Sequence, residues 1–181
     1  MATEIELQPL TSLEASSYYI PAHGRVPNSS AQNKPLLIYR NCIRAWASPA
    51  SIERHLKTVG VVEPQWRYTM YSTSHFHSTT HEVLCVFQGS AELLFGGDDN
   101  PENVETTVKA GDVIIVPAGV AHRLITDREG NFEMVGSYPP GASWDMCYGK
   151  PGEEPKVSRI KQIEWFKRDP IYGSEGPVLD N

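Results

Sequence analysis

The chain has 181 residues, of which 40% are hydrophobic and 21% charged, and its formal net charge at pH 7 is −6. This composition is ordinary for a soluble globular protein of one domain, and no run approaches the roughly 18 apolar residues needed to cross a bilayer. The negative charge disfavours nucleic acid and acidic membranes, so small molecules are the expected ligands. Three cysteines without a CxxC pair and a start without secretory features predict a cytoplasmic protein.

The first elements read as an arm, a strand and a helix. Residues 1–34 mix Ser, Pro and Asn with short apolar pieces and predict an N-terminal arm. The apolar run from Leu36 to Tyr39 predicts a strand. A helix should follow, with Ser48 capping its first turn, Pro49 at its first position and Gly60 ending it. We expect this helix to cover an edge of the sheet.

The most informative segment contains His75, His77, His81 and Glu82. Successive side chains on a strand point to opposite faces, so His75 and His77 should project together while Phe76 points away. A turn then leads to the next apolar strand, which Glu82 opens. By strict alternation His81 faces away from Glu82, and two interpretations stay open. It is either structural or solvent-facing, or it acts as an extra ligand, a donor behind the ligands or a proton carrier.

A second cluster runs from Gly111 to His122. The β-branched residues 113–116 predict a strand, which Pro117 and Gly119 stop before another strand begins at His122. His122 can meet the first cluster only if these strands pack together. Short apolar strands alternate with turns throughout residues 65–138, a rhythm typical of an all-β barrel or sandwich.

Residues 139–181 depart from this alternation. Trp144 lies in a stretch of aromatic residues, a carboxylate and glycines, which could border a ligand pocket or pack on the barrel exterior or a partner subunit. The remaining tail is expected to form a covering strap or a dimer contact. Barrels with strand-forming arms often bury open edges against a second copy, so we predict a homodimer.

Three imidazoles and one carboxylate, from His75, His77, His122 and Glu82, are predicted to bind one divalent transition metal. Nitrogen and oxygen ligands suit manganese, iron, cobalt, nickel, copper or zinc, and the sequence does not choose among them. The lack of thiolate argues against a structural cysteine site. Four ligands on a six-coordinate ion leave about two positions for water, substrate or dioxygen, which is the mark of a catalytic site.

At these residues the sequence resembles the cupin superfamily. The first cupin motif, G-x5-H-x-H-x4-E-x6-G, matches at His75, His77, Glu82 and Gly89, with Thr69 at the opening Gly position. The second motif, G-x5-P-x-G-x2-H-x3-N, matches at Gly111, Pro117, Gly119 and His122, with Thr126 where the family often has Asn. Neither of these two departures from the motifs falls on a predicted metal ligand. The resemblance implies a double-stranded β-helix, or jelly roll, that binds its metal through these four side chains inside the barrel.

A closer resemblance, to the small YjlB-like single-domain cupins, covers most of the chain. It is carried by residues 35–39, 77–84 and 138–152. That subgroup is largely uncharacterised, so the likeness implies a fold and a metal site and leaves the reaction open. The expected architecture is all-β, with a jelly-roll core at residues 35–138, one or two peripheral helices, an N-terminal arm at 1–34 and a C-terminal extension at 139–181.

Strand alternation also predicts the walls of the cavity around the ion. Tyr71 shares a face with His75 unless a bulge intervenes, Leu84 follows Glu82, and Leu124 and Thr126 follow His122. With Trp144, these are the candidate substrate-binding residues: Tyr71, Leu84, Leu124, Thr126 and Trp144.

The leading functional hypothesis is a metal-dependent enzyme acting on a small, oxygen-rich organic molecule. A redox-active metal would support dioxygenase chemistry, and a Lewis acid would support isomerisation, dehydration or decarboxylation. Glu82 either remains a ligand or acts as a general base, with His81 as a second candidate base. The alternatives are a noncatalytic metal or metabolite binder, and a cupin whose metal is only structural.

Overall fold

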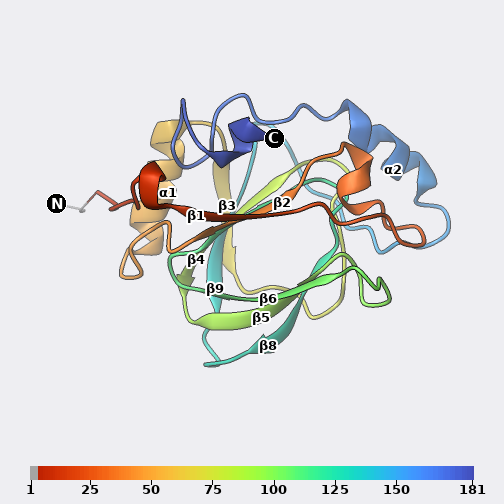
Figure 1. Ribbon diagram of the computed structural model, residues 1–181, viewed down its shortest axis with the longest axis horizontal. Helices are drawn as coiled ribbons and strands as arrows, with labels where there is room; N and C mark the ends of the chain where they lie inside the picture. Colours follow the sequence, from red (N-terminus) through yellow and green to blue (C-terminus); the bar gives the residue numbers. More distant parts are fainter. Residues whose placement is uncertain (1–3) are drawn as a thin grey trace.

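The computed structural model describes residues 4–181 and shows a mainly β protein built from two facing antiparallel sheets (Figure 1). The strands are β1 (Glu14–Tyr18), β2 (Leu36–Arg40), β3 (Glu63–Tyr68), β4 (Glu82–Gln88), β5 (Ser90–Phe95), β6 (Val104–Lys109), β7 (Val113–Val116), β8 (His122–Asp127) and β9 (Glu133–Tyr138). The larger sheet has the order β1-β2-β7-β4-β9-β3, and the smaller has the order β6-β5-β8. This is the all-β jelly roll expected from the sequence.

Two α-helices and several short 3-10 helices lie outside the sheets in the described part of the chain. The α-helices are α1 (Pro49–Val59) and α2 (Glu154–Arg159), and the 3-10 helices are Leu10–Ser12, Asn28–Ala31, Ile160–Gln162 and Pro177–Asp180. Among residues 4–181 there is no helix with the length and apolar character to traverse a bilayer.

The larger sheet is covered on both faces, which explains why its strands read as continuous apolar runs. Its inward side chains form the core between the two sheets: Leu36, Ile38, Leu84, Val86, Ile114, Val116 and Met134. The alternate positions point outward and pack beneath α1 and the C-terminal segment: Leu37, Tyr39, Val83, Cys85, Val113, Ile115 and Val135. The jelly roll therefore has one core inside the barrel and a second core on its outer face.

Helix α1 confirms the predicted caps. Its N-cap Ser48 accepts a hydrogen bond from the backbone N–H of Ser51 at 3.2 Å, and Gly60 ends it with a φ of 76°. Its buried face presents Ile52 and Leu56 to the outer core. The helix packs against β3 and β9, so it covers the edge of the sheet where β3 lies.

The C-terminal segment, blue in Figure 1, passes over the outer face of the larger sheet. Its anchor is Asp169, which is fully buried. The carboxylate accepts a hydrogen bond from the hydroxyl of Tyr39 at 2.6 Å and from the backbone N–H groups of Ile171 and Tyr172 at 2.8 and 3.0 Å. The Tyr39 hydrogen bond fastens the segment to β2, the other two hold the local turn of the segment, and the segment packs on the barrel exterior.

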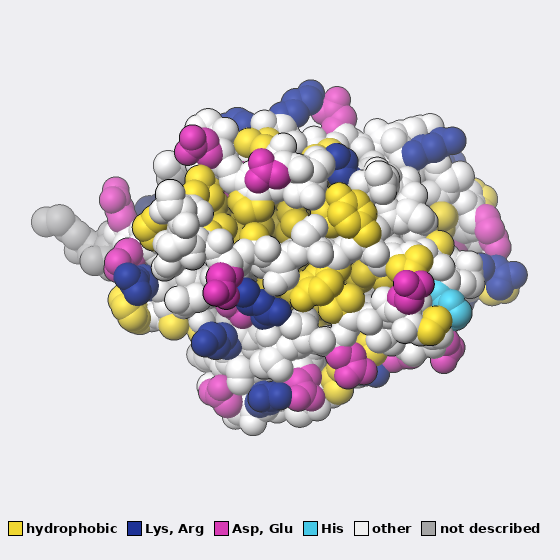
Figure 2. Space-filling model, in the orientation of Figure 1, with side chains coloured by type: hydrophobic (Ala, Val, Ile, Leu, Met, Phe, Trp, Pro, Cys, Tyr) yellow, Lys and Arg dark blue, Asp and Glu magenta, His cyan; other side chains and the backbone are white. Residues whose placement is uncertain are grey.

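The N-terminal arm contributes a strand to the larger sheet. β1 pairs antiparallel with β2 from Glu14 opposite Arg40 to Tyr18 opposite Leu36, and it forms one edge of the sheet. Hydrophobic side chains gather in the middle of the face that β1 crosses (Figure 2). A groove on the chain surface beside β1 is lined by Leu10, Leu13 and Pro177.

A candidate metal centre inside the jelly roll

The segment between β3 and β4 brings two histidines to the first strand residue of β8. His75 and His122 form an antiparallel bridge, in which the N–H of each donates to the C=O of the other at 3.2 and 2.9 Å. This segment is not a regular strand and pairs with other segments only through isolated bridges. The predicted alternation of its side chains nevertheless holds. Phe76 points away from its neighbours, bridges to Cys147 and is fully buried in a separate apolar cluster.

The three histidines share one protonation pattern because a backbone carbonyl can only accept a hydrogen bond. Nδ1 of His75 donates to the carbonyl oxygen of Thr73 at 2.8 Å, and Nδ1 of His122 donates to that of Val120 at 3.0 Å. Nδ1 of His77 donates to the carbonyl oxygen of Asp145 at 2.5 Å. In the neutral imidazole the other nitrogen, Nε2, then carries the lone pair. All three rings are therefore prepared as ligands through Nε2.

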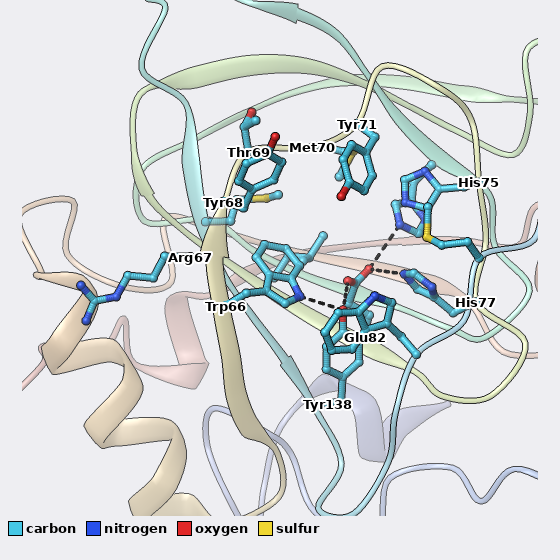
Figure 3. Close-up of a pocket in the computed structure, with 15 residues that line it drawn as sticks. Trp66, Arg67, Tyr68, Thr69, Met70, Tyr71, His75, His77, Glu82 and Tyr138 are labelled. Carbon is cyan, nitrogen blue, oxygen red and sulfur yellow. Dashed lines mark hydrogen bonds and ion pairs between the residues drawn. The ribbon is translucent and has the colours of Figure 1, made fainter.

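These ligand atoms converge at a buried point. His75, His77 and His122 each offer a nitrogen within 4.8 Å of the other two, and the three residues are between 2% and 5% exposed. The cluster could hold a metal ion. Glu82, at the start of β4, turns its Oε2 toward the same point, at 3.4 Å from Nε2 of His77 and 3.2 Å from Nε2 of His122 (Figure 3).

Glu82 is held by a relay of two aromatic side chains. The hydroxyl of Tyr138 donates to Oε1 of Glu82 at 2.9 Å, and Nε1–H of Trp66 donates to the Tyr138 oxygen at 2.8 Å (Figure 3). Oε2 is buried and accepts no hydrogen bond in the described structure. A buried carboxylate oxygen without a donor is costly, and a cation is the partner that would satisfy it. The donor set of three imidazole nitrogens and one carboxylate oxygen therefore fits a divalent transition metal.

The electrostatics of the cluster depend on Glu82: burial would lower the pKa of His77, but the carboxylate of Glu82 outweighs burial and raises it. Burial and the neighbouring His122 lower the pKa of His75 to about 3, so this ring is neutral at physiological pH. Burial alone would raise the pKa of Glu82, but the imidazoles of His77 and His122 outweigh it and hold that pKa well below its usual range. The site thus presents an ionised carboxylate beside a neutral imidazole.

A cavity of about 260 Å³ opens directly beside the cluster. Its walls include His75, His77, His122 and Glu82 together with aromatic, thioether and aliphatic side chains: Trp66, Tyr68, Tyr71, Tyr138, Trp144, Met70, Met134, Met146 and Leu84. The structure thus places Tyr71, Leu84 and Trp144, three of the five predicted substrate-binding residues, at this cavity.

The other two predicted substrate-binding residues do not line the cavity. Strand β8 carries a bulge at Ile125, because Leu93 of β5 pairs with Leu124 while the preceding Glu92 pairs with Thr126. An extra residue breaks the period-two alternation, and Thr126 emerges exposed on the surface. Leu124 packs against the edge of the barrel core instead, and its N–H donates to the carbonyl of Tyr71 at 2.9 Å. Strict alternation is therefore wrong at Thr126, whereas Leu124 does face the barrel interior as expected but lies outside the cavity.

His81 lies away from the cavity and is fully buried. Its Nδ1 accepts the backbone N–H of Ala118 at 2.9 Å, and its Nε2 donates to the carbonyl of Glu164 at 3.1 Å. Its ring packs at 4.9 Å from Trp165. Both ring nitrogens are occupied by backbone groups, which supports the structural interpretation of His81 and leaves it no free nitrogen for a role as base or extra ligand.

Several residues at the site went unrecognised in the sequence. Tyr138 and Trp66 come from adjacent strands β9 and β3, and Gly136 makes their arrangement possible. A Cβ at Gly136 would lie 2.1 Å from the Trp66 ring, so only glycine leaves room for this indole. The alternation of Met134, Gly136 and Tyr138 along β9 is the signal that could have placed Tyr138 inside the barrel.

The C-terminal segment completes the site. Asp145 offers its backbone carbonyl to His77, and its carboxylate accepts from the N–H and hydroxyl of Ser78 at 2.7 and 2.5 Å. Its neighbours Trp144 and Met146 form part of the cavity wall. Trp144 stacks on Tyr138, with ring centroids 4.9 Å apart and planes 11° from parallel.

The antiparallel jelly roll with an inward cluster of three histidines and one glutamate is the arrangement that the resemblance to cupins implied. The family model described as a cupin domain matches residues 67–138, so the chain contains a cupin domain. Over 168 residues it is 33% identical to the uncharacterised protein YjlB of Bacillus subtilis (strain 168), covering 92% of this chain and 96% of that protein.

Among solved structures, similarity extends to larger proteins. A mutant of oxalate decarboxylase OxdC from Bacillus subtilis aligns with 63% of this chain and 23% of its own, at 14% identity and a TM-score of 0.36. A 7S globulin from Momordica charantia aligns with 62% of this chain and 32% of its own, at 17% identity and a TM-score of 0.38. The chain therefore spans less than a third of each of these two structures.

Proposed function

We propose that this protein is a metal-dependent cupin enzyme that acts on a small organic molecule through an oxygen donor. The observation that carries the proposal is the unsatisfied Oε2 of Glu82, which faces the three histidines next to an open cavity. A closed structural site would be surrounded by protein, whereas this one has room for a ligand beside the point where its donors converge.

Each residue of the cluster has a distinct part in the proposed activity. His75, His77 and His122 would hold the ion through Nε2, with Glu82 as fourth ligand through Oε2. The ion would be manganese, iron, cobalt, nickel, copper or zinc, and when bound it supplies Lewis-acid polarisation or, if redox-active, oxidative chemistry.

Tyr138 would keep Glu82 in the ligand position. Burial and the adjacent carboxylate raise the pKa of Tyr138, so the phenol stays protonated and continues to donate to Oε1. With Oε1 engaged in this way, Oε2 is the oxygen that remains for the ion. This arrangement favours Glu82 as a permanent ligand over Glu82 as a mobile general base.

Metal content provides the first test. Protein purified without chelator or affinity metal should contain close to one equivalent of a transition metal by elemental analysis. His75→Ala and His122→Ala should each lose most of it while circular dichroism shows a folded protein. His23→Ala is the matched control, because His23 is an exposed histidine outside the cluster and its replacement should leave the metal content unchanged.

Turnover provides the second test and separates catalysis from binding. The metal-containing preparation is incubated with a panel of small carboxylates, enols and phenols, with and without dioxygen, and products are followed by mass spectrometry. Conversion that disappears in His75→Ala supports an enzyme. Tight binding of a panel member with no product in any metal form would support a noncatalytic binder instead. A metal that only stabilises the fold would admit no ligand from solution.

A further inference from the structure

We infer that the ligand of this cavity has a planar, apolar body, such as an aromatic ring, with a single metal-binding group at one end and no second carboxylate. The inference rests on the proposed metal site and adds the chemical class of the substrate. It follows from what the walls of the cavity offer beyond the four candidate metal ligands.

The walls beyond the cluster are dominated by aromatic rings and thioethers. Trp66, Tyr138 and Trp144 present aromatic surface, and Met70, Met134 and Met146 present sulfur and methylene groups. Aromatic faces attract other rings by offset or edge contact, and methionine sulfur makes favourable contacts with aromatic edges. A ligand with a flat hydrocarbon body would gain favourable contacts with these walls. A fully hydroxylated chain would instead lose hydrogen bonds to water on entering the cavity.

The two polar side chains nearest Glu82 are already occupied. Trp66 donates to Tyr138, and Tyr138 donates to Glu82, so neither side chain has its N–H or O–H hydrogen available for a ligand. The hydroxyls of Tyr68 and Tyr71 make no hydrogen bond among residues 4–181 and are partly exposed, and the buried hydroxyl oxygen of Thr69 has no hydrogen-bond partner. A single hydroxyl or carbonyl on the ring would satisfy it.

The cavity has no available cation for a second acidic group. Among the lining residues, Arg67 is the only lysine or arginine, and it points out of the cavity toward α1 (Figure 3). There its guanidinium makes two hydrogen bonds to the carboxylate of Glu53, at 2.6 and 2.9 Å. A second carboxylate at the far end of the ligand, out of reach of the ion, would be desolvated without a partner, which is strongly unfavourable.

Three large side chains at the cavity are left unusually exposed. Tyr68, Tyr71 and Trp144 are 51%, 56% and 45% exposed, although each contributes to the cavity wall. The Tyr71 ring lies 5.7 Å from the His75 ring, and the Trp144 ring stacks on Tyr138. A ring held by a group on the ion would extend between these aromatics and cover surface that is otherwise in water.

Matched pairs of metal-binding probes test this inference. Benzohydroxamate and acetohydroxamate carry the same chelating group, and only the first carries a ring. Isothermal titration of the cobalt-loaded protein should show benzohydroxamate binding at least about tenfold more tightly, as expected when most of a phenyl ring is buried. Terephthalate, which adds a second carboxylate to benzoate at the far end of the ring, should bind more weakly than benzoate.

Variants assign the preference to the cavity. Trp144→Ala should reduce the ratio of the two hydroxamate affinities at least threefold and leave acetohydroxamate binding nearly unchanged. Tyr148→Ala is the matched control, since Tyr148 is an aromatic residue of the same segment with 41% exposure and does not line the cavity. It should leave both affinities as they are in the wild type.

The outcomes separate this inference from the proposed function. If the cobalt-loaded protein binds both hydroxamates equally, or prefers terephthalate to benzoate, the substrate class is wrong while the metal site stands. A preference that survives unchanged in Trp144→Ala also overturns the assignment to this cavity. If the wild type takes up no metal, both proposals fail together.

Discussion

The backbones of His75 and His122 are paired directly, so two of the three histidines are placed by the main chain itself. Each donates its N–H to the carbonyl of the other, at 3.2 and 2.9 Å, and the two rings have centroids 4.4 Å apart. Side chains of a directly opposed antiparallel pair leave the same face of the ladder. The geometry of the candidate metal centre is therefore set largely by the folded backbone.

A preformed site predicts that metal stabilises the native protein. Saturating zinc should raise the melting temperature of the chelator-treated wild type, because an ion that binds only the folded state adds about 4 kcal/mol at a thousandfold excess over Kd. Scanning calorimetry measures the shift. His122→Ala should lose it and His23→Ala should keep it. Identical melting temperatures for the wild type with and without zinc would contradict a metal site.

The relay from Trp66 through Tyr138 to Glu82 predicts a role in metal affinity. Tyr138→Phe removes the donor to Oε1 of Glu82 and frees this carboxylate to rotate. Loss of such a supporting hydrogen bond typically weakens metal binding by about 10- to 100-fold. Competition with a chromophoric chelator gives the affinity, and Tyr148→Phe is the matched control. Unchanged affinity in Tyr138→Phe would mean that Glu82 is held without the phenol.

Because the Trp66 ring packs closely against Gly136, adding one methyl group at this position should lower the stability of the protein. In Gly136→Ala the new Cβ would meet the Trp66 ring at 2.1 Å, and the rigid indole cannot move without losing its bond to Tyr138. Overpacking of this kind costs about 1–3 kcal/mol in the free energy of unfolding. Urea denaturation checks the loss. Combining Gly136→Ala with Trp66→Leu should recover part of it, and a fully stable single variant would show that β3 can shift.

His81 predicts a pH dependence of stability. Burial lowers its pKa to about 4 in the folded protein, against about 6.5 in the unfolded chain. As pH falls through this interval the unfolded state binds the extra proton, so stability decreases by up to about 3 kcal/mol and is fully present only above pH 6.5.

The matched variant for this prediction is His81→Gln, which can accept from Ala118 and donate to Glu164 without titrating. Urea unfolding of chelator-treated protein at pH 7 and pH 4.5 should show a smaller loss in the variant than in the wild type. Equal losses in the two proteins would assign the acid sensitivity to other groups.

The exposed edge of the larger sheet supports the predicted homodimer. β1 pairs with β2 on one side only, and the surface groove beside it includes Leu10 and Leu13 in its lining. Unpaired strand edges next to apolar surface are commonly covered by a second copy. Sedimentation velocity at micromolar concentration should give a dimer, and Leu13→Glu should shift it toward monomer. A wild type that sediments only as a monomer would contradict this expectation.

The sequence predicted the fold and the histidine cluster because both depend on local spacing. Two histidines separated by one residue share a face in any extended segment, and His122 follows a clear strand and turn. Continuous apolar runs also indicated strands, although their cause, burial on both faces of the sheet, became evident only from the packing of α1 and the C-terminal segment.

The features of the site that the sequence did not predict depend on irregular or long-range geometry. The bulge at Ile125 places Thr126 on the surface, and no residue type in the sequence indicates such a bulge. Tyr138 and Trp66 became neighbours of Glu82 only through the order β4-β9-β3 in the sheet. His81 adjoins a candidate ligand in sequence, but its direction was decided by the distant Ala118 and Glu164.

The carbonyl of Asp145 that orients His77 lies beyond the last strand of the barrel. A nascent chain that has emerged only as far as Tyr138 would contain every candidate ligand and yet lack the group that fixes the tautomer of His77. Competence to take up an ion should therefore arise late in synthesis, after the final segment has docked. Truncation after β9 would also uncover the outer apolar face of the larger sheet, so we expect it to destabilise the sheets as well as the metal centre.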